Sequence, residues 1–206
     1  MDFCGLFYAI VGYLLGSILF ADVVGKLLFH KDISENSADK NPGVFNAFKN
    51  GGFFCGAIAL IGDLAKGFFP VFLYLRQGQG QGQSPIWLGI VLASPVIGHI
   101  FPIFRGFKGG KGIATSFGVL LGFFPNLKPL LIFAFVFIFF SFVLSITPDI
   151  YKTIITYPIT LGLLFALGDN IGLGLGFLFI SVGVLFKLIT SKEEKEELKV
   201  RLLWKH

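Results

Sequence analysis

Residues 98–115 read GHIFPIFRGFKGGKGIAT and separate two apolar stretches of the chain. We call them the Gly-Lys segment. The segment holds five glycines together with the basic residues Arg105, Lys108 and Lys111. Glycine lets backbone N–H groups approach a ligand closely, and successive N–H groups can line a concave anion site. Lysine ammonium groups add charge-assisted hydrogen bonds, and a helix that begins after Gly112 would point its N-terminus at the same anion. The pattern therefore favours a phosphate-binding turn over the alternative, a plain cytoplasmic loop whose cations obey the positive-inside rule.

The composition places the chain in a membrane. Hydrophobic residues make up 54% of the 206 residues, phenylalanine occurs 27 times, and the mean hydropathy is +0.80. A soluble domain of this size cannot bury that much apolar surface, whereas a bilayer can. The net charge of +5 is spread through short loops, which speaks against nucleic acid as a partner. Cys4 and Cys55 lie in separate apolar stretches and no Cys/His cluster has metal-ligand spacing, so we expect neither a metal nor a cofactor.

The apolar stretches divide the chain into membrane segments. Seven can be recognised, at residues 3–25, 53–75, 86–104, 113–125, 129–147, 151–168 and 171–190. A spanning helix needs about 17–25 residues, so the fourth stretch is short and either begins inside the Gly-Lys segment or is re-entrant. We therefore expect an all-α membrane protein with about seven transmembrane helices. Its membrane domain would cover residues 1–190, and a charged tail, 191–206, would form a short helix on the inner membrane surface.

The basic residues predict the orientation. With the N-terminus outside, fourteen lysines and arginines fall in the inside loops and tail, whereas only Arg76 and Lys128 lie outside. The positive-inside rule then places the N-terminus outside, the C-terminus in the cytoplasm and the Gly-Lys segment on the cytoplasmic side.

Three polar residues within the apolar stretches require an explanation. Asp63 and Lys66 lie inside the second apolar stretch, where ionisable groups are costly and usually functional. Their spacing of three lets them pair on one helix face, as a structural ion pair or as direct substrate contacts. His99 closes the third stretch and is either a hydrogen-bonded structural residue or a catalytic base. The sequence pattern leaves both choices open, the one for the Asp63/Lys66 pair and the one for His99.

The first long loop contains a second group of polar residues. Asn41-Pro42-Gly43 is a turn signal, and Asn46 and Lys49 follow with a spacing of three. On one helix face they would offer an amide and a cation to a ligand. A plain turn before a membrane-entry helix explains the same residues without a ligand.

Taken together, these residues resemble the bacterial membrane acyl-phosphate:glycerol-3-phosphate acyltransferase family. The segment from Gly98 to Thr115 is similar to that family's glycine-lysine motif at almost every position, and Ser17, Asp32-Ile33, the Asn41–Asn46 turn and the Asp63/Lys66 pair fall in family order. On this basis we expect catalytic roles for Lys111, Asn46, Lys49 and His99. Substrate contacts are expected for Ser17, Asn41, Gly43, Asp63, Lys66, Lys108, Gly109, Gly110, Gly112 and Thr115.

The chain also departs from the family pattern. Phe45 stands in place of a threonine, and Lys49 stands in place of an arginine, which keeps the charge but loses a bidentate fork for phosphate. No serine-rich turn is recognisable around Thr147–Thr156. The family's C-terminal His-Arg-x-Asn-Ile element is missing as well.

The resemblance implies an enzyme of phospholipid synthesis in the cell inner membrane. It would move a fatty acyl group from acyl phosphate to glycerol 3-phosphate, giving lysophosphatidic acid and phosphate, and would work without a cofactor as a monomer. The departures keep an alternative open, a non-catalytic paralogue that binds a phosphorylated metabolite or an anionic lipid. A small transporter for an organic anion would explain Asp63 and Lys66 but not the Gly-Lys match.

Overall fold

The computed structural model describes residues 2–34, 41, 43–77, 84–168, 170–191 and 197–202. Helices dominate these parts of the chain: α1 Phe3–Gly16, α2 Phe20–Phe29, α3 Val44–Asn46, α4 Phe53–Gln77, α5 Pro85–Ile100, α6 Ile113–Leu121, α7 Lys128–Ile138, α8 Asp149–Leu167 and α9 Ile171–Thr190. Shorter elements are the π-helical turns η1 Ala47–Gly51 and η3 Phe139–Val143 and the 3₁₀ turn η2 Ile103–Arg105. The strands β1 Leu144–Thr147 and β2 Lys199–Leu202 form an antiparallel pair.

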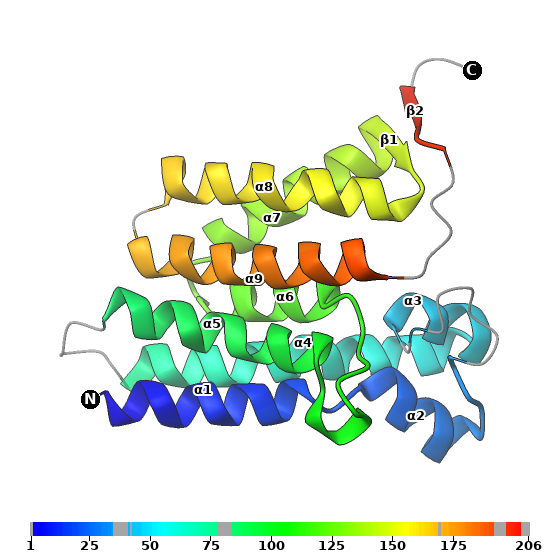
Figure 1. Ribbon diagram of the computed structural model, residues 1–206, viewed down its shortest axis with the longest axis horizontal. Helices are drawn as coiled ribbons and strands as arrows, with labels where there is room; N and C mark the ends of the chain where they lie inside the picture. Colours follow the sequence, from blue (N-terminus) through cyan, green and yellow to red (C-terminus); the bar gives the residue numbers. More distant parts are fainter. Residues whose placement is uncertain are drawn as a thin grey trace.

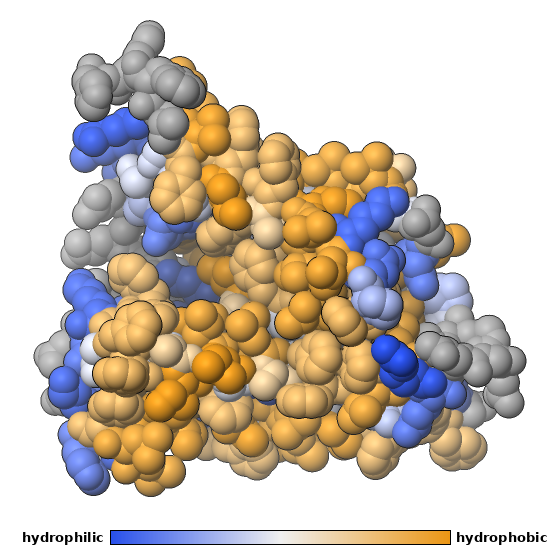
Figure 2. Space-filling view, turned by 180° about the vertical axis from the view of Figure 1, so that it is seen from behind, coloured by the Kyte–Doolittle hydropathy of each residue, from blue (hydrophilic) through white to orange (hydrophobic). Residues whose placement is uncertain are grey.

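The long helices lie roughly along a common direction (Figure 1). The start of α1, the end of α4, the start of α5, the end of α8 and the start of α9 lie at one end of the bundle, and α2, α3, β1 and β2 lie at the other. Hydrophilic residues gather at these two ends, and a broad hydrophobic surface lies between them (Figure 2). Many large apolar side chains of the described residues are exposed, and Phe3, Phe54 and Phe135 are more than two thirds exposed. Such a surface suits contact with lipid tails rather than with water.

Four helical segments are long and apolar enough to cross a membrane: α4, Pro85–Arg105 with α5 as its main part, α8 and α9. The pair α1 and α2 passes the same test together, bent by 44° at the break, which gives up to five candidate spans in the described residues. Helix α6 has nine residues and is about 14 Å long, less than half of the roughly 30 Å of a bilayer core. A helical, multi-pass architecture is therefore confirmed, whereas the number of seven spans stays a prediction.

Two expectations about local structure are wrong. The fifth apolar stretch, 129–147, is helical only as far as Val143, because β1 occupies Leu144–Thr147. The tail was expected to form a helix, yet its residues Lys199–Leu202 form a strand paired with β1. The sequence Lys-Val-Arg-Leu alternates between polar and apolar residues with a period of two, which is the period of a strand. This pairing brings β2 next to the segment that precedes α8.

Small residues set the close packing of the long helices. The spacing Gly12/Gly16 predicts a close helix contact, and a Cβ atom at either position would overlap Ser94 or Pro95 of α5. The pair Gly172/Gly176 on α9 fits in the same way against Leu88 and Leu92 of α5. Helix α5 is thereby held between α1 and α9, and its C-terminal end carries the Gly-Lys segment.

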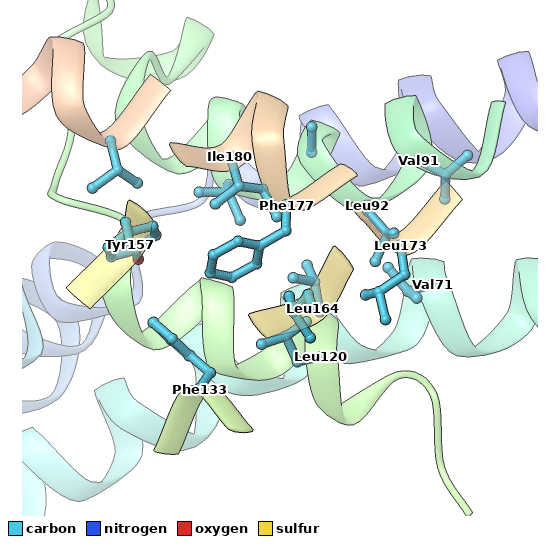
Figure 3. Packing of buried hydrophobic residues seen from close by; sticks show 14 of the residues in the cluster. Val71, Val91, Leu92, Leu120, Phe133, Tyr157, Leu164, Leu173, Phe177 and Ile180 are labelled. Carbon is cyan, nitrogen blue, oxygen red and sulfur yellow. The ribbon is translucent and has the colours of Figure 1, made fainter. Parts of the chain in front are cut away.

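The main core forms where α7, α8 and α9 meet the inner helices. Phe133, Tyr157 and Phe177 are fully buried and contact one another (Figure 3). The Tyr157 and Phe177 rings are stacked with an interplanar angle of 16°, and Phe133 meets both of them edge-on. This aromatic cluster fixes α8 relative to its neighbours.

Candidate functional site

A cavity of about 480 Å³ lies where α3, α6 and α8 begin. Its lining comes from the first loop with α3, from α4, from the end of α5, from the Gly-Lys segment with α6, from α7 and from the start of α8. The lining residues are Asn41, Gly43, Val44, Phe45, Asn46, Leu60, Asp63, His99, Lys111, Gly112, Ile113, Ala114, Phe117, Phe137, Asp149, Lys152 and Thr153.

The cavity combines charged residues and helix N-termini with an apolar wall. Lys111 and Lys152 belong to its lining together with Asp63 and Asp149, and the N-terminal turns of α6 and α8 begin there. Unsatisfied N–H groups at a helix N-terminus carry a partial positive charge, which favours anions. Leu60, Phe117 and Phe137 supply apolar surface in the same cavity. The arrangement suits a molecule that has an anionic head and an apolar tail.

Only part of the Gly-Lys segment faces this cavity. The N–H groups of Gly109 and Gly110 donate to the carbonyl oxygens of Ile100 and His99, at 3.2 and 3.1 Å, and so cap the end of α5. A Cβ atom at Gly109 would overlap the His99 carbonyl, and one at Gly110 would overlap the His99 ring. These glycines therefore let the segment lie flat against α5, which corrects the expectation that their N–H groups face an anion.

The second half of the segment keeps the predicted geometry. Gly112 adopts a φ of +81°, in the left-handed region that glycine tolerates best, and α6 begins directly after it. Lys111, Gly112 and the first residues of α6 all line the cavity. A cationic side chain and a helix N-terminus thus share one wall of the site.

Asp63, Lys66 and His99 form a buried network beside the cavity. The Lys66 Nζ atom lies 2.7 Å from each of three acceptors: the Asp63 carboxylate, the Ile18 carbonyl oxygen and the His99 Nδ1 atom. All three side chains are at most 3% exposed. The predicted pairing of Asp63 with Lys66 is therefore confirmed. Of the two ionic residues, only Asp63 also lines the cavity.

This network assigns the tautomer of His99. An ammonium group can only donate, so the Nδ1 atom of His99 accepts a hydrogen bond from Lys66 and the imidazole carries its own proton on Nε2. The Nε2 atom faces Gly110, and the residue lines the cavity. With Nδ1 engaged and the proton on Nε2, His99 has no free basic nitrogen.

The first loop places Asn46 in the site but not Lys49. The Asn46 side chain is buried and donates to the Asn41 carbonyl oxygen at 2.7 Å, and both residues line the cavity. Lys49 is exposed and does not belong to the lining. The expectation that the two share one helix face is wrong, because the π-helical turn η1 over Ala47–Gly51 has more residues per turn than an α-helix.

Contacts away from the cavity hold this loop in place. Asp32 Oδ1 accepts hydrogen bonds from the Ser34 hydroxyl and N–H, at 2.6 and 2.9 Å, and these bonds lower the pKa of Asp32. Arg105 lies 3.4 Å from the Ser34 hydroxyl and 3.6 Å from the Asp22 carboxylate. Ile33, between Asp32 and Ser34 in the sequence, is fully buried. Arg105 thus ties the Gly-Lys segment to the first loop instead of facing the cavity.

Three other predicted residues lie outside the cavity lining. The Ser17 hydroxyl donates to the Tyr13 carbonyl oxygen and accepts from the Ile103 N–H, at 2.9 and 3.3 Å, so it joins α1 to the Gly-Lys segment. Thr115 is fully buried on α6, whereas Lys108 is exposed. The structure does not bring these three side chains to the cavity.

The start of α8 contributes residues that the sequence pattern did not reveal. Asp149, Lys152 and Thr153 line the cavity, and the Lys152 Nζ atom lies 2.8 Å from the Asp149 carboxylate. Hydropathy places the beginning of this apolar stretch at residue 151 and so hides the first helical turn. The available signal was Pro148 followed by Asp149, since an acidic residue in the first turn is typical of a helix start.

Comparisons with known proteins agree on one family. The family model described as glycerol-3-phosphate acyltransferase matches residues 6–199. A glycerol-3-phosphate acyltransferase of Streptococcus thermophilus (strain ATCC BAA-491 / LMD-9) is 40% identical over 158 residues. That alignment covers 73% of this chain and 66% of the relative, slightly less than two thirds of the relative's length.

Two solved structures share the fold. They are crystal structures of PlsY (YgiH), described as an integral membrane glycerol 3-phosphate acyltransferase, in a glycerol 3-phosphate form and a lysophosphatidic acid form. Their TM-scores are 0.74 and 0.72, with 28% and 27% sequence identity. In both cases the match covers 89% of this chain and 87% of the other chain.

Proposed function

Because this chain belongs to the glycerol-3-phosphate acyltransferase family, we propose that it transfers a fatty acyl group from acyl phosphate to the 1-hydroxyl of glycerol 3-phosphate. The products are lysophosphatidic acid and inorganic phosphate. The observation that carries the proposal is the cavity in which Lys111 and the N-terminus of α6 lie beside the apolar side chains of Leu60, Phe117 and Phe137. Both proposed substrates carry a phosphate, and the donor also carries an acyl chain that requires an apolar wall.

Different residues of the cavity bind different parts of the two substrates. Lys111 and the first N–H groups of α6 bind one phosphate group by charge-assisted hydrogen bonds. The Nε2–H of His99 donates to a substrate oxygen, and Asn46 holds Asn41 in the lining through its hydrogen bond. The N-terminal turn of α8, where Lys152 is paired with Asp149, binds the second phosphate. The acyl chain lies along the aromatic side chains and continues into the bilayer.

The reaction needs positioning more than a protein base. The hydroxyl oxygen of glycerol 3-phosphate attacks the acyl carbon, a new C–O ester bond forms, and the bond from the acyl carbon to the phosphate oxygen breaks. The departing phosphate takes the hydroxyl proton, so the atoms and charges balance without a side-chain base. His99 is not assigned that role because its Nδ1 atom already accepts from Lys66. Catalysis then rests on orientation of the two substrates and on stabilisation of the phosphate leaving group.

The assay of this function uses purified protein with labelled glycerol 3-phosphate and palmitoyl phosphate. We expect lysophosphatidic acid to accumulate with release of one inorganic phosphate per product. Absence of product with retained binding of glycerol 3-phosphate would identify a non-catalytic paralogue instead. Uptake of glycerol 3-phosphate into proteoliposomes without acylation would identify a transporter. We expect the protein to work as a monomer.

We further propose that the cavity opens on the cytoplasmic side of the inner membrane. The orientation follows from the fourteen basic residues of the inside loops and tail, against Arg76 and Lys128 outside. It places the N-terminus outside, seven helical segments in the membrane domain of residues 1–190, and the tail of residues 191–206 in the cytoplasm.

Cysteine labelling tests this orientation in a Cys4→Ser background, which removes the exposed native thiol. In whole spheroplasts, an impermeant maleimide should label Ser84→Cys, before α5. It should label Glu197→Cys, in the tail, only after the membrane is permeabilised. The reverse pattern would place the cavity on the outer face and contradict the proposal.

A further inference from the structure

A buried chain of hydroxyl groups ends at the wall of the cavity. The Tyr157 hydroxyl of α8 donates to the Ser116 Oγ atom of α6 at 2.9 Å. The Ser116 hydroxyl in turn donates to the Gly112 carbonyl oxygen at 2.9 Å, and the Ser116 N–H donates to the same oxygen at 2.8 Å. Tyr157 and Ser116 are completely buried. The Gly112 carbonyl is therefore fixed by two hydrogen bonds from a neighbouring helical turn.

The fixed carbonyl determines where an N–H group of the site points. The carbonyl of Gly112 and the N–H of Ile113 belong to one planar trans peptide, in which the two bonds point in opposite directions. Because the carbonyl oxygen points along α6 toward Ser116, the Ile113 N–H points out of the helix N-terminus. Gly112 and Ile113 both line the cavity beside Lys111. The chain of hydrogen bonds from Tyr157 through Ser116 to the Gly112 carbonyl, here called the relay, thus holds one N–H donor of the anion-binding wall in position.

The tyrosine at the far end of the relay cannot move easily. Its ring is stacked on Phe177, with centroids 5.5 Å apart, and meets Phe133 edge-on at 5.2 Å (Figure 3). A phenylalanine would keep these ring contacts and lose only the hydroxyl. The site therefore permits a substitution that removes the hydrogen bond and leaves the packing in place.

We propose that Tyr157 is a positioning residue for the phosphate-binding wall of the cavity and that it acts through Ser116 on the Gly112–Ile113 peptide. The inference rests on the proposed function in taking the anion as a substrate phosphate. Neither hydroxyl touches the substrate. The relay orients the α6 N-terminus, and its loss weakens phosphate binding more than it slows the chemical step.

Kinetics of Tyr157→Phe and Ser116→Ala test the relay. Each variant should raise the KM for one of the two phosphate substrates about three- to tenfold, the range of one ordinary hydrogen bond, with a smaller change in kcat. The double variant should be no worse than Ser116→Ala alone, since both changes interrupt the same relay. Fully additive effects, or an unchanged KM in both single variants, would overturn the proposal.

Ser181→Ala is the matched control. Ser181 is also a buried helical serine whose hydroxyl donates to a carbonyl four residues earlier, that of Phe177, at 2.7 Å. It lies on α9, outside the cavity lining, and should leave both KM values unchanged. An equal rise in KM in Ser181→Ala would show that any buried hydroxyl deletion has this effect and would refute a specific role for the relay.

Binding of inorganic phosphate separates this inference from the proposed reaction. Calorimetric titration with inorganic phosphate should give a dissociation constant that rises three- to tenfold in Tyr157→Phe and Ser116→Ala and not in Ser181→Ala. If the wild-type protein makes no lysophosphatidic acid but shows this pattern, the acyl-transfer proposal fails and the relay stands. If acyl transfer occurs and phosphate affinity is the same in all variants, the relay fails.

Discussion

Lys111→Ala is expected to reduce acyl transfer by about one to two decades while the detergent-solubilised protein stays folded. The side chain belongs to the cavity lining beside the N-terminus of α6, and a hydrogen bond to a charged group contributes about 1.5–3 kcal/mol. Each 1.4 kcal/mol corresponds to about a tenfold change in rate. Initial rates of lysophosphatidic acid formation measure the loss, and the thermal unfolding midpoint in detergent reports whether the fold is kept.

Substitutions of two other lysines serve as controls for Lys111→Ala. Lys26→Ala removes an exposed lysine paired with Asp22 on α2, far outside the cavity lining, and should change neither activity nor folding measurably. Lys108→Ala removes a charge three residues before Lys111, on the exposed part of the Gly-Lys segment, and should cost less activity than Lys111→Ala. Equal activity of the Lys111 and Lys26 variants would show that the segment is a connector and that the site is placed wrongly.

The substitution Lys66→Ala is expected to destabilise the fold by about 3–5 kcal/mol. It leaves the Asp63 carboxylate, which is 1% exposed, without its ammonium partner, and breaking a buried pair on one side has an effect of this size. It also removes the group that donates to His99 Nδ1 and to the Ile18 carbonyl oxygen. Because whole domains are stable by only about 5–15 kcal/mol, little folded protein should be recovered.

Removing both charges separates the ion pair from the rest of the network. The double variant Asp63→Asn/Lys66→Met keeps similar side-chain volumes and buries no unpaired charge, so it should recover most of the lost unfolding midpoint. Its activity should stay low, because the tautomer of His99 is no longer fixed by Lys66. If Lys66→Ala unfolds at the same temperature as the wild-type protein, Asp63 is not held as an unpaired buried carboxylate and the assignment of the network is wrong.

Local patterns in the sequence were sufficient for the membrane class and for most helices. The apolar stretches at residues 53–75 and 171–190 correspond to α4 and α9 within two residues at each end, because continuous apolar composition is a property of the segment itself. The spacing of Asp63 and Lys66 also predicted their contact correctly, since residues three apart on a helix are neighbours whatever surrounds them. The Gly-Lys segment was sufficient to indicate the family.

Contacts between distant parts of the chain were decided only by the tertiary structure. Nothing near Asp149 or Lys152 indicates that the start of α8 meets the Gly-Lys segment, because that meeting depends on how α6, α7 and α8 pack. The N–H groups of Gly109 and Gly110 donate to carbonyl oxygens at the end of α5, although a glycine-rich sequence is equally suited to binding an anion. A sequence pattern specifies which hydrogen bonds and charges a segment can offer. The packing of the helices specifies which partner takes them, since a buried polar group is satisfied by the acceptor or donor that the fold brings within about 3 Å.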